Sequence, residues 1–322
     1  KVKIISPNNI KKNIKINSDI TVAAISGIAG LYPTIEMIKK SKKVLIANKE
    51  AIICGWNIIK IIAKKNNTQL VPIDSELFSI MKILENQKKE NIKKIYLTAS
   101  GGPFLNIKQS KLKKIKPKDA IKHPKWKMGK KISVDSATLM NKILEVAEAH
   151  KFFSIDSNKI EIVIHPESLV HAIVEFKNGL YKFIYHETSM IIPLANAIFE
   201  DKLNIEDFLK FKLSSSKSNI YKSLNFRKVN DKIFPIINLK NRINEHNSTP
   251  IIINAINEIL VDQYLKKKLP FASFYKLILS VLNDRNYKKY AIKEPKNIEQ
   301  ILQIDKWSRR ITYEKIERKK NA

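Results

Sequence analysis

Apolar and polar positions in the first part of the chain repeat in a regular order. Three short apolar runs, at 19–25, 42–50 and 68–76, predict β-strands. Between them, apolar residues at helical spacing predict helices near 33–40 and 55–64. Strands that alternate with helices are typical of parallel sheets, so the sequence predicts half of an α/β sheet here. No glycine-rich turn is recognised after any of these strands.

The pattern becomes denser in the middle of the chain. Apolar runs predict short strands at 94–98, 160–165 and 171–176. Helical spacing predicts helices near 136–152 and 188–200. We expect an α/β region with a mixed sheet.

The strand pattern disappears in the last third. From about 201 to 232 polar residues dominate, which predicts a surface linker. Ser248, Thr249 and Pro250 then combine a capping residue with a helix-starting proline. Helical spacing continues to the end of the chain, so we expect a small helical bundle.

Length and charge limit the classes of function. A chain of 322 residues can form two or three domains. A net charge of +30 would fit nucleic-acid binding, but the lysines are spread along the chain and no arginine precedes Arg227. Base recognition relies mostly on arginine, and the many Ile and Asn residues indicate an AT-rich genome that favours lysine. We therefore expect no nucleic-acid partner, and a positive surface that attracts small anionic substrates.

Cysteine use and hydropathy exclude two further classes. The single cysteine, Cys54, rules out an internal disulfide and fits a reducing compartment. Its apolar neighbours predict a buried, inert thiol. No run of 18 or more apolar residues occurs, so we expect no membrane-spanning segment.

Residues 123–150 join a basic loop to a predicted helix and hold most of the candidate chemistry. On a helix, Asn141, Lys142 and Glu145 lie three and four positions apart, so all three can face one pocket that holds an anion and a metal together. Ser136 is expected near the helix start, where a hydroxyl and free backbone N–H groups favour a phosphate. The loop contributes His123, Trp126, Met128 and Gly129.

Three carboxylates are candidates for a metal site. Asp74 and Glu76 are two apart at a predicted strand end, so both should project to the same side. Glu145 can supply a third carboxylate. Three oxygen ligands without cysteine or clustered histidine point to a hard divalent cation, Mg²⁺ or Mn²⁺. The alternative is a strand-end turn with solvated acids.

Other strand ends carry weaker signals. Lys49 and Glu50 follow an apolar strand, the position where α/β sheets place ligand contacts. A surface ion pair is the alternative. Ser100 and the two glycines after it follow another strand, where small residues let the backbone approach a phosphate, although such a stretch is more often only a turn.

Two of the six histidines are candidates for the site. His123 precedes a proline and a Trp-x-Met pair, and His171 is the first residue of a predicted strand. His165 is expected to be structural. No role is assigned to the remaining three, which are His150, His186 and His246.

These segments resemble, in the same order, the 1-deoxy-D-xylulose 5-phosphate reductoisomerases, a family of the non-mevalonate isoprenoid pathway. The resemblance extends from about Thr21 to the C-terminal helices. Besides residues 123–150, the motifs that carry it are IANKEAIICG at 46–55, PIDSE at 72–76, LTASGGPF at 97–104, VIHPESLVHAIVEF at 163–176 and INAINE at 253–258.

The resemblance implies an α/β fold with a partial Rossmann-like domain, an α/β catalytic domain and a C-terminal helical bundle. It implies NADPH- and metal-dependent conversion of 1-deoxy-D-xylulose 5-phosphate to 2-C-methyl-D-erythritol 4-phosphate, with Mg²⁺, Mn²⁺ or Co²⁺. The family carries a glycine turn for the NADPH phosphates, so the chain is expected to begin part-way through that domain. The expected parts are 1–70 (rest of the NADPH-binding domain), 71–200 (catalytic), 201–232 (linker) and 233–322 (helical).

Similarity to the family also implies roles for individual residues. The metal ligands would be Asp74, Glu76 and Glu145. Lys49, Ser75, Glu76 and Glu145 would contact substrate, while Ser100, Ser136, Asn141 and Lys142 would hold its phosphate. His123 and Trp126 belong to a lid that expels water when it closes, and Lys49, Glu76, His123 and Trp126 would act in catalysis. Asn48, Glu50 and Gly129 would contact NADPH.

Partners and location follow from the same resemblance. We expect a small phosphorylated sugar as substrate, a homodimer, and a bacterial cytoplasmic location, with a plastid-type organelle as the open alternative. A catalytically silent relative that binds phospho-sugar and metal is the alternative function.

Three single positions and one segment depart from the family pattern. Leu77 stands where the family usually has histidine, Ala99 and Ile143 stand where it has glycine, and HETSMIIP at 186–193 replaces a more polar Glu-Pro-Asp-Met-Arg-Thr-Pro pattern. None of these removes an expected metal or phosphate ligand.

Overall fold

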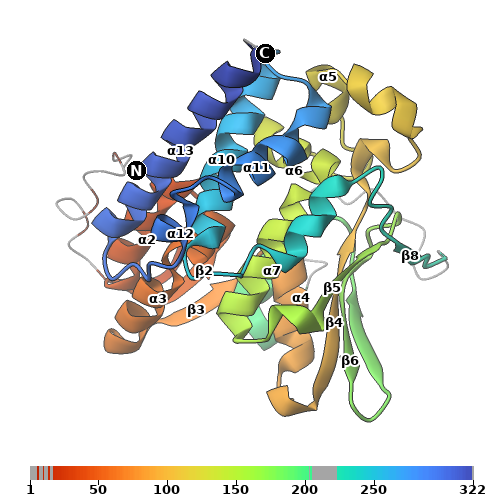
Figure 1. The fold of residues 1–322 in the computed structure, drawn as a ribbon. Coiled ribbons are helices and arrows are strands. Elements are labelled where there is room, and N and C mark those ends of the chain that lie inside the picture. Colours follow the sequence, from red (N-terminus) through yellow and green to blue (C-terminus); the bar gives the residue numbers. More distant parts are fainter. Residues whose placement is uncertain are drawn as a thin grey trace.

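The structure of the protein, a computed structural model, describes Ser6, Ile10, Ile14, residues 17–202, Asn204 and residues 223–320. Its first part is a three-stranded parallel sheet in the order β1-β2-β3. The alternation of strands and helices predicted there is confirmed (Figure 1). The elements are β1 (Ser18–Ala23), α2 (Leu31–Ile38), β2 (Ser41–Ile46), α3 (Lys49–Lys65) and β3 (Gln69–Pro72).

A glycine turn does follow a strand in this part, so the expectation of none is wrong. Gly27 has φ of 73°, in the left-handed region that favours glycine. A Cβ on Gly30 would lie 2.1 Å from Nδ2 of Asn48 and 2.2 Å from the carbonyl oxygen of Ile25. Only glycine fits there, because Asn48 donates hydrogen bonds to the Ile25 and Gly27 carbonyls across the turn.

The middle part is a mixed sheet, as predicted, and it has five strands in the order β7-β6-β4-β5-β8. Strands β4 and β5 are parallel, and the other pairs are antiparallel. Strands β7 and β8 were not predicted, because their side chains are mostly exposed and give no apolar run. The strands are β4 (Ile92–Ala99), β5 (Ile160–Ile164), β6 (Val170–Phe176), β7 (Tyr181–Tyr185) and β8 (Arg227–Lys228).

Helices connect and cover this mixed sheet. They are α4 (Ser75–Leu84), α5 (Pro117–Ala120), α6 (Lys130–Thr138), α7 (Met140–Phe153) and α8 (Ile191–Phe199). The single helix predicted at 136–152 is in fact the end of α6 and all of α7. Leu139 divides them with φ of 64°, a conformation that leucine rarely adopts and that the sequence does not signal.

The C-terminal part is helical, as predicted. Helices α10 (Thr249–Leu265), α11 (Phe274–Leu282), α12 (Tyr287–Ala291) and α13 (Ile298–Lys320) pack together above the sheets in Figure 1. Ser248 precedes α10 as expected, but its hydroxyl donates to the carbonyl of Lys293 and does not cap the helix. Most of the linker predicted at 201–232 lies outside the described residues.

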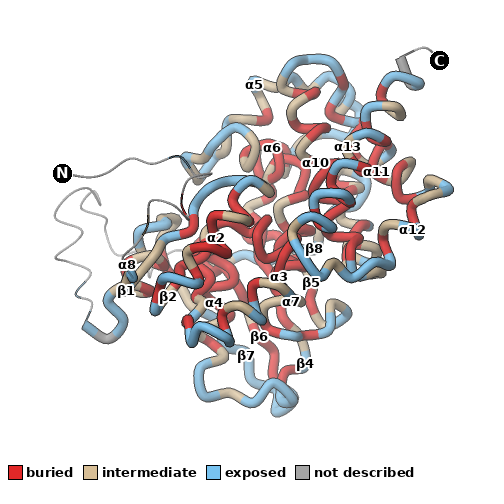
Figure 2. The backbone as a smooth tube through the Cα atoms, turned by 90° about the vertical axis from the view of Figure 1, so that its left-hand side faces the viewer, coloured by how far each residue is buried: buried red, intermediate tan, exposed pale blue. Residues whose placement is uncertain are grey.

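Helix α7 lies at the centre of the molecule and is buried around most of its circumference (Figure 2). One continuous hydrophobic core includes residues of the parallel sheet, the mixed sheet and the helical bundle. Within it, Ile143 and Leu144 of α7 are fully buried. Burial of each such side chain contributes about 1.5–3 kcal/mol. Polar residues of α7 are consequently held in a dry and rigid setting.

The helical bundle also supports the helix that carries Ser136. Asn257 of α10, part of the INAINE motif, donates a hydrogen bond of 2.7 Å to the Asp135 carboxylate on α6. Both side chains are buried.

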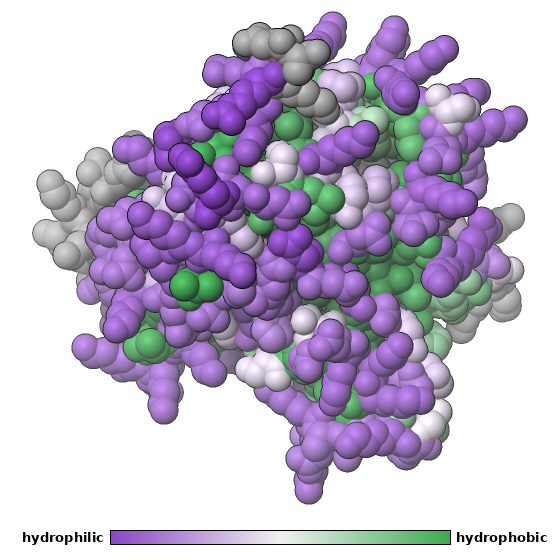
Figure 3. Space-filling view, viewed as in Figure 1, coloured by the Kyte–Doolittle hydropathy of each residue, from purple (hydrophilic) through white to green (hydrophobic). Residues whose placement is uncertain are grey.

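Surface properties agree with the expectations from composition. Hydrophilic side chains cover most of the face in Figure 3 and are not gathered over one element. Among the described helices, none is both long and apolar enough to cross a membrane. Cys54 is buried as expected, and burial raises the pKa of its thiol well above the usual value.

Candidate active site

A cavity of about 220 Å³ lies where the ends of β2, β3 and β4 meet α4, α6 and α7. Eleven of the predicted site residues line it. They are Lys49, Asp74, Ser75, Glu76, Ser100, His123, Trp126, Ser136, Asn141, Lys142 and His171.

Asp74, Glu76 and Glu145 converge on one side of this cavity, as expected. One carboxylate oxygen from each lies within 4.8 Å of the others. They converge because of a helix start and not, as predicted, because of a strand end. Asp74 is the N-cap of α4 and accepts a hydrogen bond from the N–H of Glu76, which lies in the first helical turn. Both carboxylates are placed by the helix start, where negative charge is favoured. The donor set fits a hard divalent cation.

Two buried lysines neutralise these carboxylates. The Lys49 ammonium donates to Asp74 at 2.8 Å, to Asn141 Oδ1 at 2.9 Å and to Glu145 at 3.1 Å. Lys142 contacts Glu76 and, at 2.7 Å, Glu145. Burial alone would lower the pKa of each lysine, but the adjacent carboxylates raise it, so both stay charged.

The acids that face these lysines titrate differently. Burial opposes ionisation of Glu76, but the charge of Lys142 and hydrogen bonds outweigh it and lower its pKa to about 2. Burial and the neighbouring charge of Glu76 raise the pKa of Glu145, whereas Lys142 and Lys49 lower it. The net result is a pKa of about 7. Glu145 is therefore the member of the group that most readily keeps a proton. A cation that binds all three must displace that proton.

Glu148 lies one helical turn beyond Glu145 and was not predicted. It is fully buried, and neither carboxyl oxygen has a hydrogen-bond partner among the described residues. Burial, with the charge of Asp74 adding to it, raises the pKa of Glu148 well above 4.5. An unpaired buried carboxylate is costly, so the group is neutral near pH 7.

Replacing Glu148 by glutamine is expected to preserve the fold and stabilise it increasingly as pH rises. The folded protein keeps the Glu148 proton to a higher pH than the unfolded chain, whose pKa is near 4.5. The wild type therefore loses stability relative to Glu148→Gln above that pH, by at most about 1.4 kcal/mol per pH unit. Denaturant unfolding at several pH values measures this difference. Glu90→Gln, the same change at an exposed position, should show no such trend; equal pH trends in both variants would contradict a neutral Glu148.

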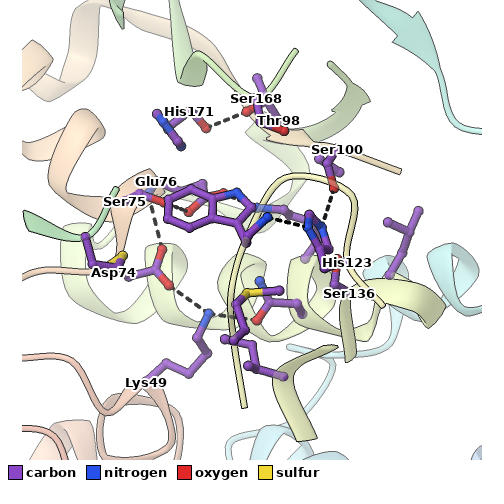
Figure 4. A pocket seen from close by; sticks show the side chains of 18 of the residues that line it. Lys49, Asp74, Ser75, Glu76, Thr98, Ser100, His123, Ser136, Ser168 and His171 are labelled. Atoms are coloured by element: carbon purple, nitrogen blue, oxygen red, sulfur yellow. Dashed lines mark hydrogen bonds and ion pairs between the residues drawn. The ribbon is translucent and has the colours of Figure 1, made fainter. Parts of the chain in front are cut away.

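Ser100 and His123 form the opposite end of the cavity (Figure 4). Nδ1 of His123 accepts from the backbone N–H groups of Lys125 and Trp126, so its proton must lie on Nε2, which is 2.9 Å from Ser100 Oγ. Ser100 Oγ also accepts from the N–H of Gly102 at 3.1 Å. With two donors directed at its oxygen, the Ser100 hydroxyl has its own proton available for an anion.

Ser136 faces the same end of the cavity but not from a helix start. It lies in the last turn of α6, so the expectation that its helix N-terminus holds a phosphate is wrong. Its proximity to Ser100 comes from Gly102, where an added Cβ would lie 3.1 Å from the Ser136 carbonyl oxygen and 3.2 Å from Cα of Ala137. Only a glycine with its φ of 59° lets the two segments approach this closely.

The loop before α6 covers the cavity. Trp126 and Met128 line it, and both are partly exposed. Burial, helped by the charge of Lys142, lowers the pKa of His123 to about 4. His123 is thus neutral at physiological pH, and it is within reach of the charge of Lys142, which pairs with Glu76 and Glu145.

Several residues of the wall were not predicted as site residues. His171 lines the cavity as expected, but its neighbours Thr98, Ser168 and Met190 were missed. Small hydroxyl side chains on strand ends carry no distinctive spacing. His165 is structural as expected: it contacts the Asn225 carbonyl at 2.9 Å and accepts from the N–H of Leu169.

Four predicted residues do not line the cavity. Glu145 lies behind its wall and is fully buried. Asn48 caps α3 by accepting from the N–H of Ala51, and Glu50 pairs with Lys131 at 2.8 Å. Gly129 is exposed before α6, with open space around it. Cofactor contacts for the last three residues stay a prediction.

Models of one family match most of the chain. The 1-deoxy-D-xylulose 5-phosphate reductoisomerase model matches residues 3–55, and two models of the C-terminal domain of that enzyme match residues 70–153 and 187–311. Among curated relatives, the reductoisomerase of Pelagibacter ubique is 44% identical over 89% of this chain and 73% of its own length. The reductoisomerase from Wolbachia of Drosophila simulans is 42% identical over 94% of this chain and 76% of its own length.

Solved structures agree. A crystal structure of DOX-P reductoisomerase in complex with NADPH, fosmidomycin and magnesium has a TM-score of 0.86 and 30% identity, and covers 97% of this chain and 78% of its own. The Zymomonas mobilis enzyme in complex with NADPH has a TM-score of 0.84 and 29% identity, with the same coverage.

Proposed function

Because the chain belongs to the 1-deoxy-D-xylulose 5-phosphate reductoisomerase family, we infer that it catalyses the reaction of that family. It converts 1-deoxy-D-xylulose 5-phosphate to 2-C-methyl-D-erythritol 4-phosphate, with NADPH and a divalent metal ion as cofactors. One observation carries this most directly. A group of three carboxylates and a cluster of hydroxyl donors with Lys142 share one cavity beneath a tryptophan-bearing loop.

The three carboxylates would hold the metal. Asp74, Glu76 and Glu145 offer hard oxygen ligands within reach of one ion. A bound divalent ion supplies charge stabilisation at the substrate's ketone and hydroxyl oxygens, and NADPH supplies the hydride. We propose that Lys49 and Lys142, which neutralise these acids in the structure, turn to the substrate when the carboxylates bind a cation.

The other end of the cavity would hold the substrate phosphate. Ser100 donates its free hydroxyl proton, Ser136 and Asn141 add polar groups, and Lys142 adds a charge-assisted contact. With phosphate and metal at opposite ends, the sugar carbons lie between Lys49 and Ser75 on one side and the loop on the other. This fixes the reacting bond relative to the metal.

His123 and Trp126 would close the site. His123 is neutral and ties the loop to Ser100, so loop position and phosphate binding are linked through one hydrogen bond. The indole of Trp126 excludes water from the reacting carbons. Asn48, Glu50 and Gly129 remain the proposed contacts for NADPH.

We also propose a homodimer in the bacterial cytoplasm. The relatives are bacterial. Strand β7 is at the edge of the described mixed sheet and exposes Tyr181 and Phe183, and Leu180 just before it is also exposed. This surface suits pairing with a second copy. Light scattering of the purified protein gives its mass in solution.

The function is tested by following NADPH loss after addition of 1-deoxy-D-xylulose 5-phosphate. Oxidation should require the substrate, stop with a chelator and return with Mg²⁺ or Mn²⁺. Binding of substrate and metal without any NADPH oxidation would contradict the proposal. It would favour the catalytically silent relative.

A further inference from the structure

His171 and His186 form a buried, stacked pair beside the cavity. Their ring centroids are 4.0 Å apart, and the ring planes differ by only 15°. His171 is the second residue of β6 and lines the cavity; His186 follows β7 directly and does not line it. The backbone N–H of His186 donates to the Leu169 carbonyl at 2.9 Å, which holds the end of β7 against the start of β6. His186 therefore meets the cavity wall through its stacking contact with His171.

Backbone contacts set the tautomer of both rings. Nδ1 of His186 lies 2.8 Å from the carbonyl oxygen of Glu187, so this nitrogen carries the proton. The His171 ring contacts the backbone of His186, and its Nε2 has no partner among the described residues, which places the His171 proton on Nδ1. Nε2 of His186 also lacks a hydrogen-bond partner in the part of the chain that the structure describes. Each ring is left with an unpaired, buried lone pair on Nε2.

Burial keeps both rings neutral. Only 2% of His171 and 7% of His186 are exposed. Burial lowers the pKa of both rings, and for His171 the adjacent His186 and Lys142 lower it further. A neutral Nε2 lone pair accepts a hydrogen bond, so its partner in the cavity is a donor such as a sugar hydroxyl or a water molecule.

The loop that covers the cavity rests on this pair. The indole of Trp126 meets the His171 ring edge-to-face, with centroids 5.9 Å apart and planes at 71°. His171 thus has an aromatic ring on each of two sides. Figure 4 places His171 on the side of the cavity opposite Lys49.

We propose that His186 is a positioning residue for substrate binding: by stacking on His171 it fixes the orientation in which His171 meets the ligand and supports the closed position of Trp126. This rests on the proposed function for the identity of the ligand. His186 has no role predicted from the sequence, and it lies in the segment that departs from the family pattern.

His186→Ala removes the stacking surface, and His186→Phe keeps an aromatic ring there without the imidazole nitrogens. We expect His186→Ala to raise the KM for 1-deoxy-D-xylulose 5-phosphate about tenfold with kcat nearly unchanged. The variant loses the stacking of His186 on His171, and with it the aligned contact of His171 with the bound substrate. A contact made equally in the substrate complex and in the transition state affects KM and not kcat. His186→Phe should restore KM to near the wild-type value. His246→Ala is the matched control, since His246 is tilted against Tyr287 and does not line the cavity.

Nitrogen NMR of the His171 ring in the ligand-free protein gives a readout that needs no turnover. A single Nδ1–H tautomer is expected in the wild type and His186→Phe. A mixture is expected in His186→Ala, because without the stacked ring His171 no longer keeps a fixed orientation toward the backbone of residue 186. If His186→Ala fails to fold, His186→Phe decides by the same two readouts. An unchanged KM in His186→Ala, or a His186→Phe variant with raised KM or mixed tautomers, would overturn the proposal. A wild type that shows the single tautomer but does not turn over the substrate would instead count against the proposed function.

Discussion

Glu76→Gln is expected to lower kcat/KM by about 10³-fold and to weaken metal binding strongly. The substitution keeps the shape of the side chain but removes a charged oxygen ligand from the group formed with Asp74 and Glu145. A loss of this size corresponds to about 4 kcal/mol of transition-state stabilisation, within the several kcal/mol that a metal ion supplies. Calorimetric titration with Mn²⁺ and steady-state kinetics measure the two effects.

Glu85→Gln is the matched control for that experiment. Glu85 ends the same helix, α4, and is exposed in an ion pair with Lys82. Exposed pairs of this kind contribute little, about 0–1 kcal/mol. A Glu76→Gln variant that binds Mn²⁺ as tightly as Glu85→Gln would show that Glu76 is not a ligand.

Lys142→Met is expected to raise the KM for 1-deoxy-D-xylulose 5-phosphate about 100-fold. Binding of the unphosphorylated sugar should weaken much less. Methionine keeps part of the apolar stem but removes the buried ammonium group. A charge-assisted contact to phosphate in a buried site contributes about 3 kcal/mol, which is about a 100-fold change in affinity. Ligand titrations with the phosphorylated and unphosphorylated sugars separate loss of the phosphate contact from a general disturbance of the binding site.

Lys127→Met provides the comparison, because Lys127 also lines the cavity but is exposed. It should change both affinities only slightly. Equal losses for the two sugars in Lys142→Met would mean that Lys142 serves the carboxylates alone, as its contacts with Glu76 and Glu145 allow.

Local spacing predicted the parts of the site that depend on one helix. Asn141, Lys142 and Glu145 face one another because the periodicity of α7 places them three and four positions apart. The break at Leu139 was missed, since a left-handed leucine has no sequence signal. For that reason Ser136 was placed at a helix start when it lies at a helix end.

Features that depend on packing between distant segments could not be predicted. Glu148 is buried without a hydrogen-bond partner among the described residues because α7 is covered on nearly all sides, which only the assembled core determines. The stacking of His186 on His171 depends on the register of β7 against β6, and the exposed side chains of β7 gave no strand pattern. The pairing of Glu50 with Lys131 joins α3 to α6 across 81 positions of the chain.

The most direct test of the site is a crystal structure with Mn²⁺ and 1-deoxy-D-xylulose 5-phosphate, in which anomalous scattering locates the metal. One peak is expected within bonding distance of Asp74, Glu76 and Glu145, with the substrate phosphate on Ser100, Ser136 and Lys142 in the same cavity. A metal bound elsewhere, or a phosphate at the carboxylate end, would contradict the account.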